Sequence, residues 1–300
     1  MLVYHYCSLE SLNSILKHRA LRLTNILKSN DSMEISWICR YFQQVFQQAY
    51  EQASEEVHQK ISKERMDNLI RFYTDEFFNE NYSSYRYYVT CFSKKPDLLS
   101  QWRGYADDGR GVAIGYDLDV LKTIASAPEY GKKQTVSLHE ISYSEEQQKK
   151  VVEEIIARLI QKLEGGLDSA EYQDMGGMDE ILYSFEETFL ELFQASVYMK
   201  NPFFSEESEI RLCEFAVKKR MEGEDKLLPL GARLYNYSYY VKQNQFVSYV
   251  DFDFSVCMKK LIRGLVIGPR CLTSVSDMEY YLSTFGLNDC QIWKSAGTYR

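Results

Sequence analysis

The stretch Tyr87-Tyr88-Val89-Thr90-Cys91-Phe92 marks the point where the chain changes from helical to β-rich sequence, and it decides the fold. Aromatic and β-branched residues of this kind favour a strand. A second strand is predicted at Val112-Ala113-Ile114-Gly115-Tyr116, after the turn Asp107-Asp108-Gly109-Arg110-Gly111. Between the two strands, residues 98–105 are expected to form a short helix.

Working outward from these strands, the same patterns predict the remaining elements. Residues 3–7 favour a first strand, and Ser8 is placed to cap a helix whose apolar face is Leu9, Leu12, Ile15 and Leu16. Further strands are expected at residues 21–24, 136–143, 209–217, 235–240, 246–252, 261–267 and 290–293. Further helices are expected at residues 31–64, 66–78, 117–125, 144–163, 178–200 and 274–285.

The order of these elements indicates the fold class. Strands do not alternate regularly with helices, so a doubly wound parallel sheet is disfavoured. Neither GxGxxG nor GxxxxGKS occurs, which argues against a Rossmann or P-loop site. We therefore expect a single α+β domain over residues 1–300, built on a mixed, mostly antiparallel sheet. Its helical insertions are expected at roughly 31–80 and 144–200.

Composition limits the class of protein. The chain has 300 residues, 45% of them hydrophobic, and a net charge of −8, which argues against a broad nucleic-acid footprint. Because we find no signal peptide and no apolar run of about 20 residues, we expect a cytoplasmic protein without a membrane partner. Seven scattered cysteines without a CxxC pair, and four histidines without zinc-like spacing, lead us to expect no disulfide framework and no metal.

His5 is the first candidate site residue. It lies in the first predicted strand, among Tyr4, Tyr6 and Cys7 and just before a helix. One interpretation is a histidine satisfied within the core or at a sheet edge. The other is a polar residue at a strand end that faces a cleft.

The run Glu207-Ser208-Glu209-Ile210-Arg211 is the second candidate. Residues two apart on a strand share a face, so Glu207, Glu209 and Arg211 are expected to converge. Two neighbouring acids raise the pKa of at least one of them, and Arg211, expected between the acids and solvent, lowers it. The alternative is an exposed ladder of ion pairs on an edge strand, although nearby Phe203, Phe204, Leu212 and Phe215 favour partial burial.

Weaker candidates accompany these two runs. Trp102 and Tyr105 are placed to pack on a ligand ring, or simply to fill the core. The run Asn30-Asp31-Ser32-Met33-Glu34 has the spacing of a helix cap. Lys200 and Arg270 are candidate contacts for an anion.

Taken in order, several runs resemble the bacterial domain-of-unknown-function family 2971. They are Tyr4-His5-Tyr6-Cys7-Ser8, Asn30-Asp31-Ser32-Met33-Glu34, Cys91-Phe92-Ser93, Leu99-Ser100-Gln101-Trp102-Arg103-Gly104-Tyr105-Ala106, Gly111-Val112-Ala113-Ile114-Gly115-Tyr116, Lys200, Glu207-x-Glu209-x-Arg211, Ile267-Gly268-Pro269-Arg270 and Tyr299-Arg300. Three positions depart from the family pattern. Cys7 stands where Thr is usual, Ser32 where Pro is usual, and Gly104 where His is usual.

More distantly, the order of these runs is similar to the ADP-ribosyltransferase fold, which uses NAD as its substrate. By that resemblance Glu209 is the catalytic acid, acting with His5 and Tyr105. The resemblance places Tyr6, Ser8, Trp102, Glu207 and Arg211 in nucleotide binding. It further implies that His5 and Ser8 hold ribose, that Tyr105 or Trp102 stacks on nicotinamide, and that a fixed carboxylate stabilises the cationic sugar.

The leading hypothesis is therefore an NAD-using ADP-ribosyltransferase-like enzyme or an NAD hydrolase, in a bacterial defence or stress response. The acceptor, protein or nucleic acid, is left open. The alternative is a non-catalytic module that senses a nucleotide or nucleic acid, because Cys7 and Gly104 depart from the family. A third hypothesis is a nuclease with Mg²⁺ held by Asp31, Glu207 and Glu209. One geometric condition matters most: His5 and Glu209 should meet in one cleft, with Tyr105 or Trp102 beside them. Side chains lying far apart, on opposite sides of the sheet, would remove most of the case for an enzyme.

Overall fold

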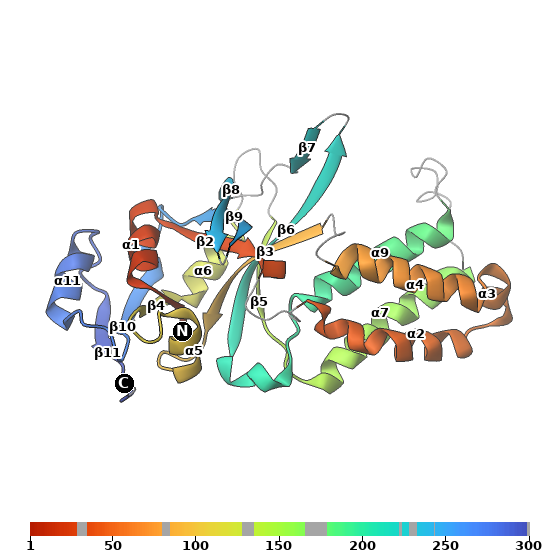
Figure 1. Ribbon diagram of the computed structural model, residues 1–300, viewed down its shortest axis with the longest axis horizontal. Helices are drawn as coiled ribbons and strands as arrows, with labels where there is room; N and C mark the ends of the chain where they lie inside the picture. Colours follow the sequence, from red (N-terminus) through yellow and green to blue (C-terminus); the bar gives the residue numbers. More distant parts are fainter. Residues whose placement is uncertain are drawn as a thin grey trace.

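The computed structural model describes residues 1–28, 35–79, 85–127, 135–165, 179–221, 224–227, 233–242 and 244–298. Figure 1 shows an elongated molecule with the sheet at its centre. A lobe at one end is formed by helices α2 (Phe42–Glu51), α3 (Glu55–Lys60), α4 (Lys63–Phe78), α7 (Glu145–Gly165) and α9 (Glu180–Ser196). Helices α1 (Leu9–His18) and α11 (Val275–Ser283) lie at the other end. The helical lobe therefore stands apart from the helices that cover the core of the sheet.

The strands form one mixed sheet. They are β1 (Leu2–Cys7), β2 (Ala20–Asn25), β3 (Tyr85–Ser93), β4 (Val112–Asp117), β5 (Val136–Glu140), β6 (Glu209–Met221), β7 (Glu224–Leu227), β8 (Leu234–Lys242), β9 (Gln245–Asp253), β10 (Ile262–Ile267) and β11 (Gln291–Lys294). The order is β11-β10-β4-β1-β3-β2-β9-β8, and β6 pairs with β3, β5 and β7. Among the described strands only β10 and β11 pair in parallel, which confirms the α+β class with a mostly antiparallel sheet.

The helices are α1 (Leu9–His18), α2 (Phe42–Glu51), α3 (Glu55–Lys60), α4 (Lys63–Phe78), α5 (Leu99–Tyr105), α6 (Leu118–Ala125), α7 (Glu145–Gly165), α9 (Glu180–Ser196), α10 (Met258–Leu261) and α11 (Val275–Ser283). The 3-10 turns are η1 (Ile26–Lys28), η2 (Ser36–Tyr41) and η3 (Pro202–Glu207). Ser8 caps α1 as predicted, with its side chain accepting from the Ser11 N–H. Within the described ranges no helix is long and apolar enough to cross a bilayer.

The single helix predicted from residue 31 to residue 64 is wrong. The described part divides into η2, α2 and α3, because the chain adopts extended backbone at Ser54 and again at Ile61. Ser62 then caps α4 by accepting a hydrogen bond from the Arg65 N–H. The periodic apolar positions continue across these breaks, which is why the sequence alone suggested one helix.

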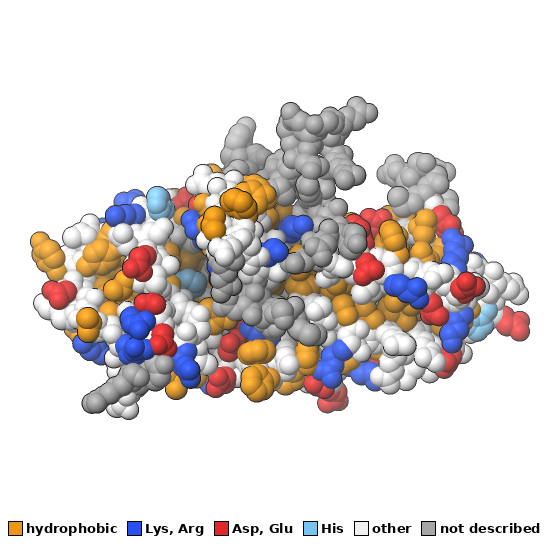
Figure 2. All heavy atoms as spheres, in the orientation of Figure 1, with side chains coloured by type: hydrophobic (Ala, Val, Ile, Leu, Met, Phe, Trp, Pro, Cys, Tyr) orange, Lys and Arg blue, Asp and Glu red, His pale blue; other side chains and the backbone are white. Residues whose placement is uncertain are grey.

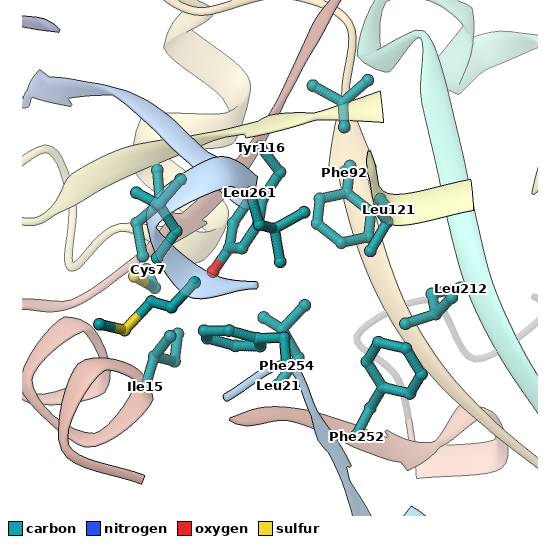
Figure 3. Close-up of a cluster of buried hydrophobic side chains, with 14 of the residues drawn as sticks. Cys7, Ile15, Leu21, Phe92, Tyr116, Leu121, Leu212, Phe252, Phe254 and Leu261 are labelled. Atoms are coloured by element: carbon teal, nitrogen blue, oxygen red, sulfur yellow. The ribbon is translucent and has the colours of Figure 1, made fainter. Parts of the chain in front are cut away.

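The main core lies on one face of the sheet, under α1, α6 and α11. Figure 3 shows its large side chains, including Phe92 and Leu212 from β3 and β6 and Phe252 from β9. A second apolar cluster fills the helical lobe and includes Tyr87 and Cys213 from the sheet. The lobe is thus anchored on β3 and β6 by packing as well as by the chain.

Strand β3 has one fully paired edge and one interrupted edge. β6 pairs along its whole length, from Tyr85 with Val217 to Ser93 with Glu209. On the other edge β1 pairs only at Ser93, and β2 pairs only at Tyr88 and Val89. Because β1 and β2 separate here, residues 90–92 of β3 face an opening in the sheet.

Candidate functional site

A cavity of about 780 Å³ lies over this opening. Val89, Thr90, Cys91 and Phe92 line it from β3, and the other walls come from β1, α1, β2, η1, α5, η3, β6, β8 and β9. Its size is typical of a site for a small molecule or cofactor. The cavity therefore arises directly from the separation of β1 and β2.

His5 lines the cavity from β1. Its Nδ1 lies 3.0 Å from the carbonyl oxygen of Cys91. Because a carbonyl only accepts, Nδ1 carries the proton in this hydrogen bond and Nε2 is left as an acceptor in the neutral ring. Burial lowers the pKa of His5, which favours that neutral form.

Ser8 and Tyr6, the two predicted nucleotide-binding residues near His5, both line the cavity but make different hydrogen bonds. Ser8 lines the cavity while capping α1. The hydroxyl of Tyr6 donates to the Lys95 carbonyl at 2.8 Å and accepts from the Leu98 N–H at 3.0 Å. The Tyr6 hydroxyl is therefore engaged in holding the loop that leads into α5.

Of the two aromatic candidates, only Tyr105 is open to a ligand. It is 44% exposed and lines the cavity. Trp102 is 1% exposed, its ring packs 4.7 Å from the Tyr6 ring, and it is not part of the cavity lining. The stacking role suggested for Trp102 is therefore unavailable in this structure, because its ring is enclosed by the core.

A hydrogen-bonded clamp fixes the α5 wall. The Trp102 Nε1–H donates to Oδ1 of Asp97 at 2.6 Å. The Ser295 hydroxyl donates to the same oxygen at 2.6 Å, and the Ala296 N–H donates to Oδ2 at 2.8 Å. The C-terminal segment thus holds the helix that carries Tyr105.

The acidic run forms a buried ionic cluster with Lys200. Nζ of Lys200 lies 2.7 Å from Oε2 of Glu207 and 3.1 Å from Oε2 of Glu209. Nε of Arg211 donates to Oε1 of Glu209 at 2.6 Å, and its NH1 donates to the Val197 carbonyl. Among these residues, Lys200, Glu207 and Glu209 line the cavity, whereas Arg211 is fully buried behind them.

The expected placement of this run needs two corrections. Glu207 ends the 3-10 turn η3 rather than lying on the strand, because Ser208 turns the backbone with φ 47° and β6 begins at Glu209. Arg211 does not lie between the acids and solvent. Lys200 joins the two carboxylates instead, so the sequence identified this lysine as an anion contact without identifying its partners.

Glu209 remains ionised at neutral pH. Burial by itself would raise the pKa of Glu209, but Arg211 and Lys200 outweigh it and lower the pKa to about 2. A carboxylate in that state cannot donate a proton near pH 7. It can attract positive charge, and Lys200 and Arg211 already balance part of its own negative charge.

His5 and Glu209 reach the cavity from opposite faces of the sheet. Tyr4 pairs with Ser93 and Ser93 pairs with Glu209, and directly paired residues point to the same face. His5, one residue further, lies on the other face beside Phe92, with 6.0 Å between the rings. Both residues line the cavity because the opening gives access to both faces.

Of the remaining sequence candidates, one lies outside the cavity lining and the others fall on residues that the structure does not describe. Residues 30–34, with Asp31, and Tyr299-Arg300 are outside the described residues. Arg270 pairs with Asp108 on the turn before β4. Within the part of the chain that the structure describes, no group of three His, Cys, Asp or Glu is arranged to hold a metal. Lys200 lies where a cation between Glu207 and Glu209 would have to bind.

Sequence reasoning missed the other end of the cavity. Arg22 of β2, Lys28 of η1, and Tyr240 and Lys242 of β8 line it, together with Asp251 of β9. Arg22 and Lys28 lie more than 200 positions from Tyr240, Lys242 and Asp251 in the chain, and no common spacing links the two groups. Only the pairing of β2 with β9, and of β9 with β8, brings them together.

One family model matches part of the chain. Residues 101–212 match the family described as "Protein of unknown function (DUF2971)". This match confirms the family resemblance over α5, β4, α7 and the acidic run. No curated protein and no solved structure matches the chain. The more distant resemblance to ADP-ribosyltransferases stays a prediction.

Gly104, where the family usually has His, lines the cavity on α5. A Cβ built at this position has no heavy atom within 4 Å. A side chain here would therefore project into open space beside Tyr105. Without a side chain at Gly104, this wall of the cavity stays open.

Proposed function

We propose that the cavity binds NAD and that the protein cleaves its N-glycosidic bond, by hydrolysis or by transfer to an acceptor. One observation carries this proposal: Glu209, held ionised, shares the cavity with Glu207 and with the exposed ring of Tyr105. A fixed negative charge is what the cationic ribose needs as nicotinamide leaves.

Each residue has a distinct part in the proposed reaction. Tyr105 stacks on the nicotinamide ring, and the Glu209 carboxylate attracts the developing charge on the ribose. Neutral His5 accepts a hydrogen bond from a ribose hydroxyl through Nε2, reaching it from the other face of the sheet. In hydrolysis the C–N bond breaks, water forms the new C–O bond, its proton passes to solvent, and neutral nicotinamide departs.

Release of nicotinamide from NAD by the purified protein tests this proposal. We expect release by the wild type, with and without candidate acceptors, and a loss of about 10²-fold or more in Glu209→Gln, the scale seen when one electrostatic stabiliser is removed. Glu206→Gln is the matched control, because Glu206 is a neighbouring but exposed acid. Absence of release above the Glu209→Gln level would refute the enzymatic proposal.

A second function is favoured by the charge balance of the same site. Both carboxylate oxygens of Glu209 already bind cations, and His5 projects from the opposite face. These features suit a module that binds a nucleotide without turnover. Thermal stabilisation by NAD without nicotinamide release would support this alternative, and an unchanged melting temperature across NAD, ADP and AMP would refute it.

A further inference from the structure

The two ends of the cavity carry opposite chemistry. Glu207 and Glu209 lie at one end, where Lys200 and Arg211 pair with them. Arg22, Lys28 and Lys242 line the other end, although the chain as a whole has a net charge of −8. Acidic groups are also present there: Asp251 lies 3.8 Å from Arg22, and Glu10 lines the wall formed by α1.

Strand register places both ends on one face of the sheet. Glu209 pairs with Ser93, and Thr24 pairs with Val89 four residues earlier on β3, so Glu209 and Thr24 share a face. Arg22, two residues before Thr24, points the same way. With strands about 4.8 Å apart, the face from β6 across β3, β2 and β9 to β8 spans on the order of 20 Å. A ligand longer than one nucleoside is needed to reach both ends.

Aromatic rings support the basic end. The guanidinium carbon of Arg22 lies 3.8 Å from the centre of the Tyr249 ring and 5.5 Å from that of Tyr240. The two rings are 6.0 Å apart. A guanidinium held flat on a ring keeps its N–H groups at its rim, where they bind phosphate oxygens in pairs. Tyr240, which lines the cavity, offers a face on which a base can stack.

We propose that this end of the cavity is a subsite for the diphosphate and the attached base of a nucleotide. Arg22, Lys28 and Lys242 bind the phosphates, and Tyr240 stacks on the base. This inference deepens the proposed function, because it orients NAD with nicotinamide at the Glu209 end and the adenine nucleotide on β2 and β8. The basic residues alone do not require that the bond be cleaved.

Binding of ADP, pyrophosphate and adenosine, measured by calorimetry at two salt concentrations, tests the subsite. We expect ADP to bind, pyrophosphate to compete with it, and adenosine to bind more weakly. Arg22→Gln should weaken ADP binding about tenfold or more, as expected for loss of a charge-assisted contact. Higher salt should weaken ADP binding to the wild type.

Arg40→Gln is the matched control. The Arg40 side chain is 44% exposed, its guanidinium carbon lies 4.3 Å from the centre of the Trp37 ring, and it pairs with Glu145. Arg22 has closely similar surroundings: it is 43% exposed, lies over the Tyr249 ring and pairs with Asp251. Arg40 lies in the helical lobe, outside the cavity lining, and its replacement should leave ADP binding unchanged. If Arg22→Gln lowers the melting temperature strongly, Lys242→Gln provides the same test from the end of β8.

The outcomes separate this inference from the enzymatic proposal. Lost ADP binding in Arg22→Gln, with normal binding in Glu209→Gln, supports the subsite even if no nicotinamide is released. No ADP binding by the wild type, equal affinity for adenosine and ADP, or unchanged binding in both Arg22→Gln and Lys242→Gln overturns it. Any of those results together with nicotinamide release would leave the enzymatic proposal intact.

Discussion

The acidic and basic ends of the cavity differ in how their charges are satisfied. At the acidic end Glu209 is 4% exposed and binds both Lys200 and Arg211, which are themselves buried. At the basic end the Arg22 side chain is 43% exposed and its ion pair with Asp251 is long, at 3.8 Å. Buried and paired charges fix geometry, whereas exposed cations keep their capacity to bind a ligand. The two ends therefore predict different responses to mutation and to pH.

Removing the buried arginine should have the largest effect. Arg211→Met removes one of the two cations that pair with the Glu209 carboxylate and leaves the Val197 carbonyl without this donor. Breaking a buried pair from one side costs about 3–5 kcal/mol, so we expect that loss in the free energy of unfolding measured with urea. Arg22→Met at the basic end should cost less than about 1 kcal/mol. Equal losses in the free energy of unfolding for Arg211→Met and Arg22→Met would show that the two ends do not differ in this way.

Acid should weaken the fold through the acidic end. The pKa of Glu209 falls from its ordinary value of 4.5 to about 2 in the folded state. Its contribution, a few kcal/mol in order of magnitude, is therefore complete above about pH 4.5 and is lost as pH falls towards about 2. Burial raises the pKa of Asp251 at the basic end, so protonation there favours the folded state. Urea unfolding at several pH values gives the free energy of unfolding as a function of pH for the wild type and for Glu209→Gln. We expect this free energy to fall more steeply with acid in the wild type, and an identical pH dependence would show that Glu209 does not carry the effect.

The α5 wall of the cavity, which carries Tyr105, offers a smaller, stabilising change. Gly104 lies in α5 with open space around a built Cβ. Gly104→Ala should raise the free energy of unfolding by about 0.5–1 kcal/mol, because alanine loses less backbone entropy in a helix. Gly109→Ala is the contrasting control and should destabilise, since Gly109 has φ +82° and a built Cβ lies 3.2 Å from Pro269. A destabilised Gly104→Ala would mean that this wall is tighter than the structure indicates.

The smallest effect on stability is expected at Asp251. Asp251→Asn removes the carboxylate beside Arg22 and should change stability by less than about 1 kcal/mol. It should strengthen ADP binding, because Arg22 no longer has an anionic neighbour competing with phosphate. Calorimetry with ADP checks this, and weaker binding in Asp251→Asn would argue that the aspartate orients Arg22.

The sequence predicted the elements better than their assembly. The predicted strand at residues 209–217 and the cap at Ser8 are present in the structure, because local propensity and hydrogen bonding specify them. The exposed β8–β9 hairpin, where hydrophobic side chains gather in Figure 2, was also expected as two strands. Which strands neighbour one another is set by long-range pairing, and periodicity carries no information about that choice.

The same limit applied to the site. His5 and Glu209 were expected on one cleft, and both line it, but their faces depend on the pairing of Tyr4 with Ser93 and could not be inferred from spacing. Lys200 was noted only as an anion contact, because its closeness to Glu207 requires the turn η3. The basic end was missed altogether, since β2 and β8 meet only through β9.

The interrupted edge of β3 has a consequence for the synthesis of the protein. The edge is bounded by β1 and β2, which are made first, while β6, β8 and β9 complete the cavity only after about residue 250 has left the ribosome. At roughly 5–20 residues per second, β3 waits many seconds for its partner β6. During that interval an aromatic strand with one open edge and one interrupted edge is exposed to other chains, a known route to aggregation. Yield of the soluble protein should therefore respond to the rate of translation and to chaperones before β6 emerges, rather than to the final stability alone.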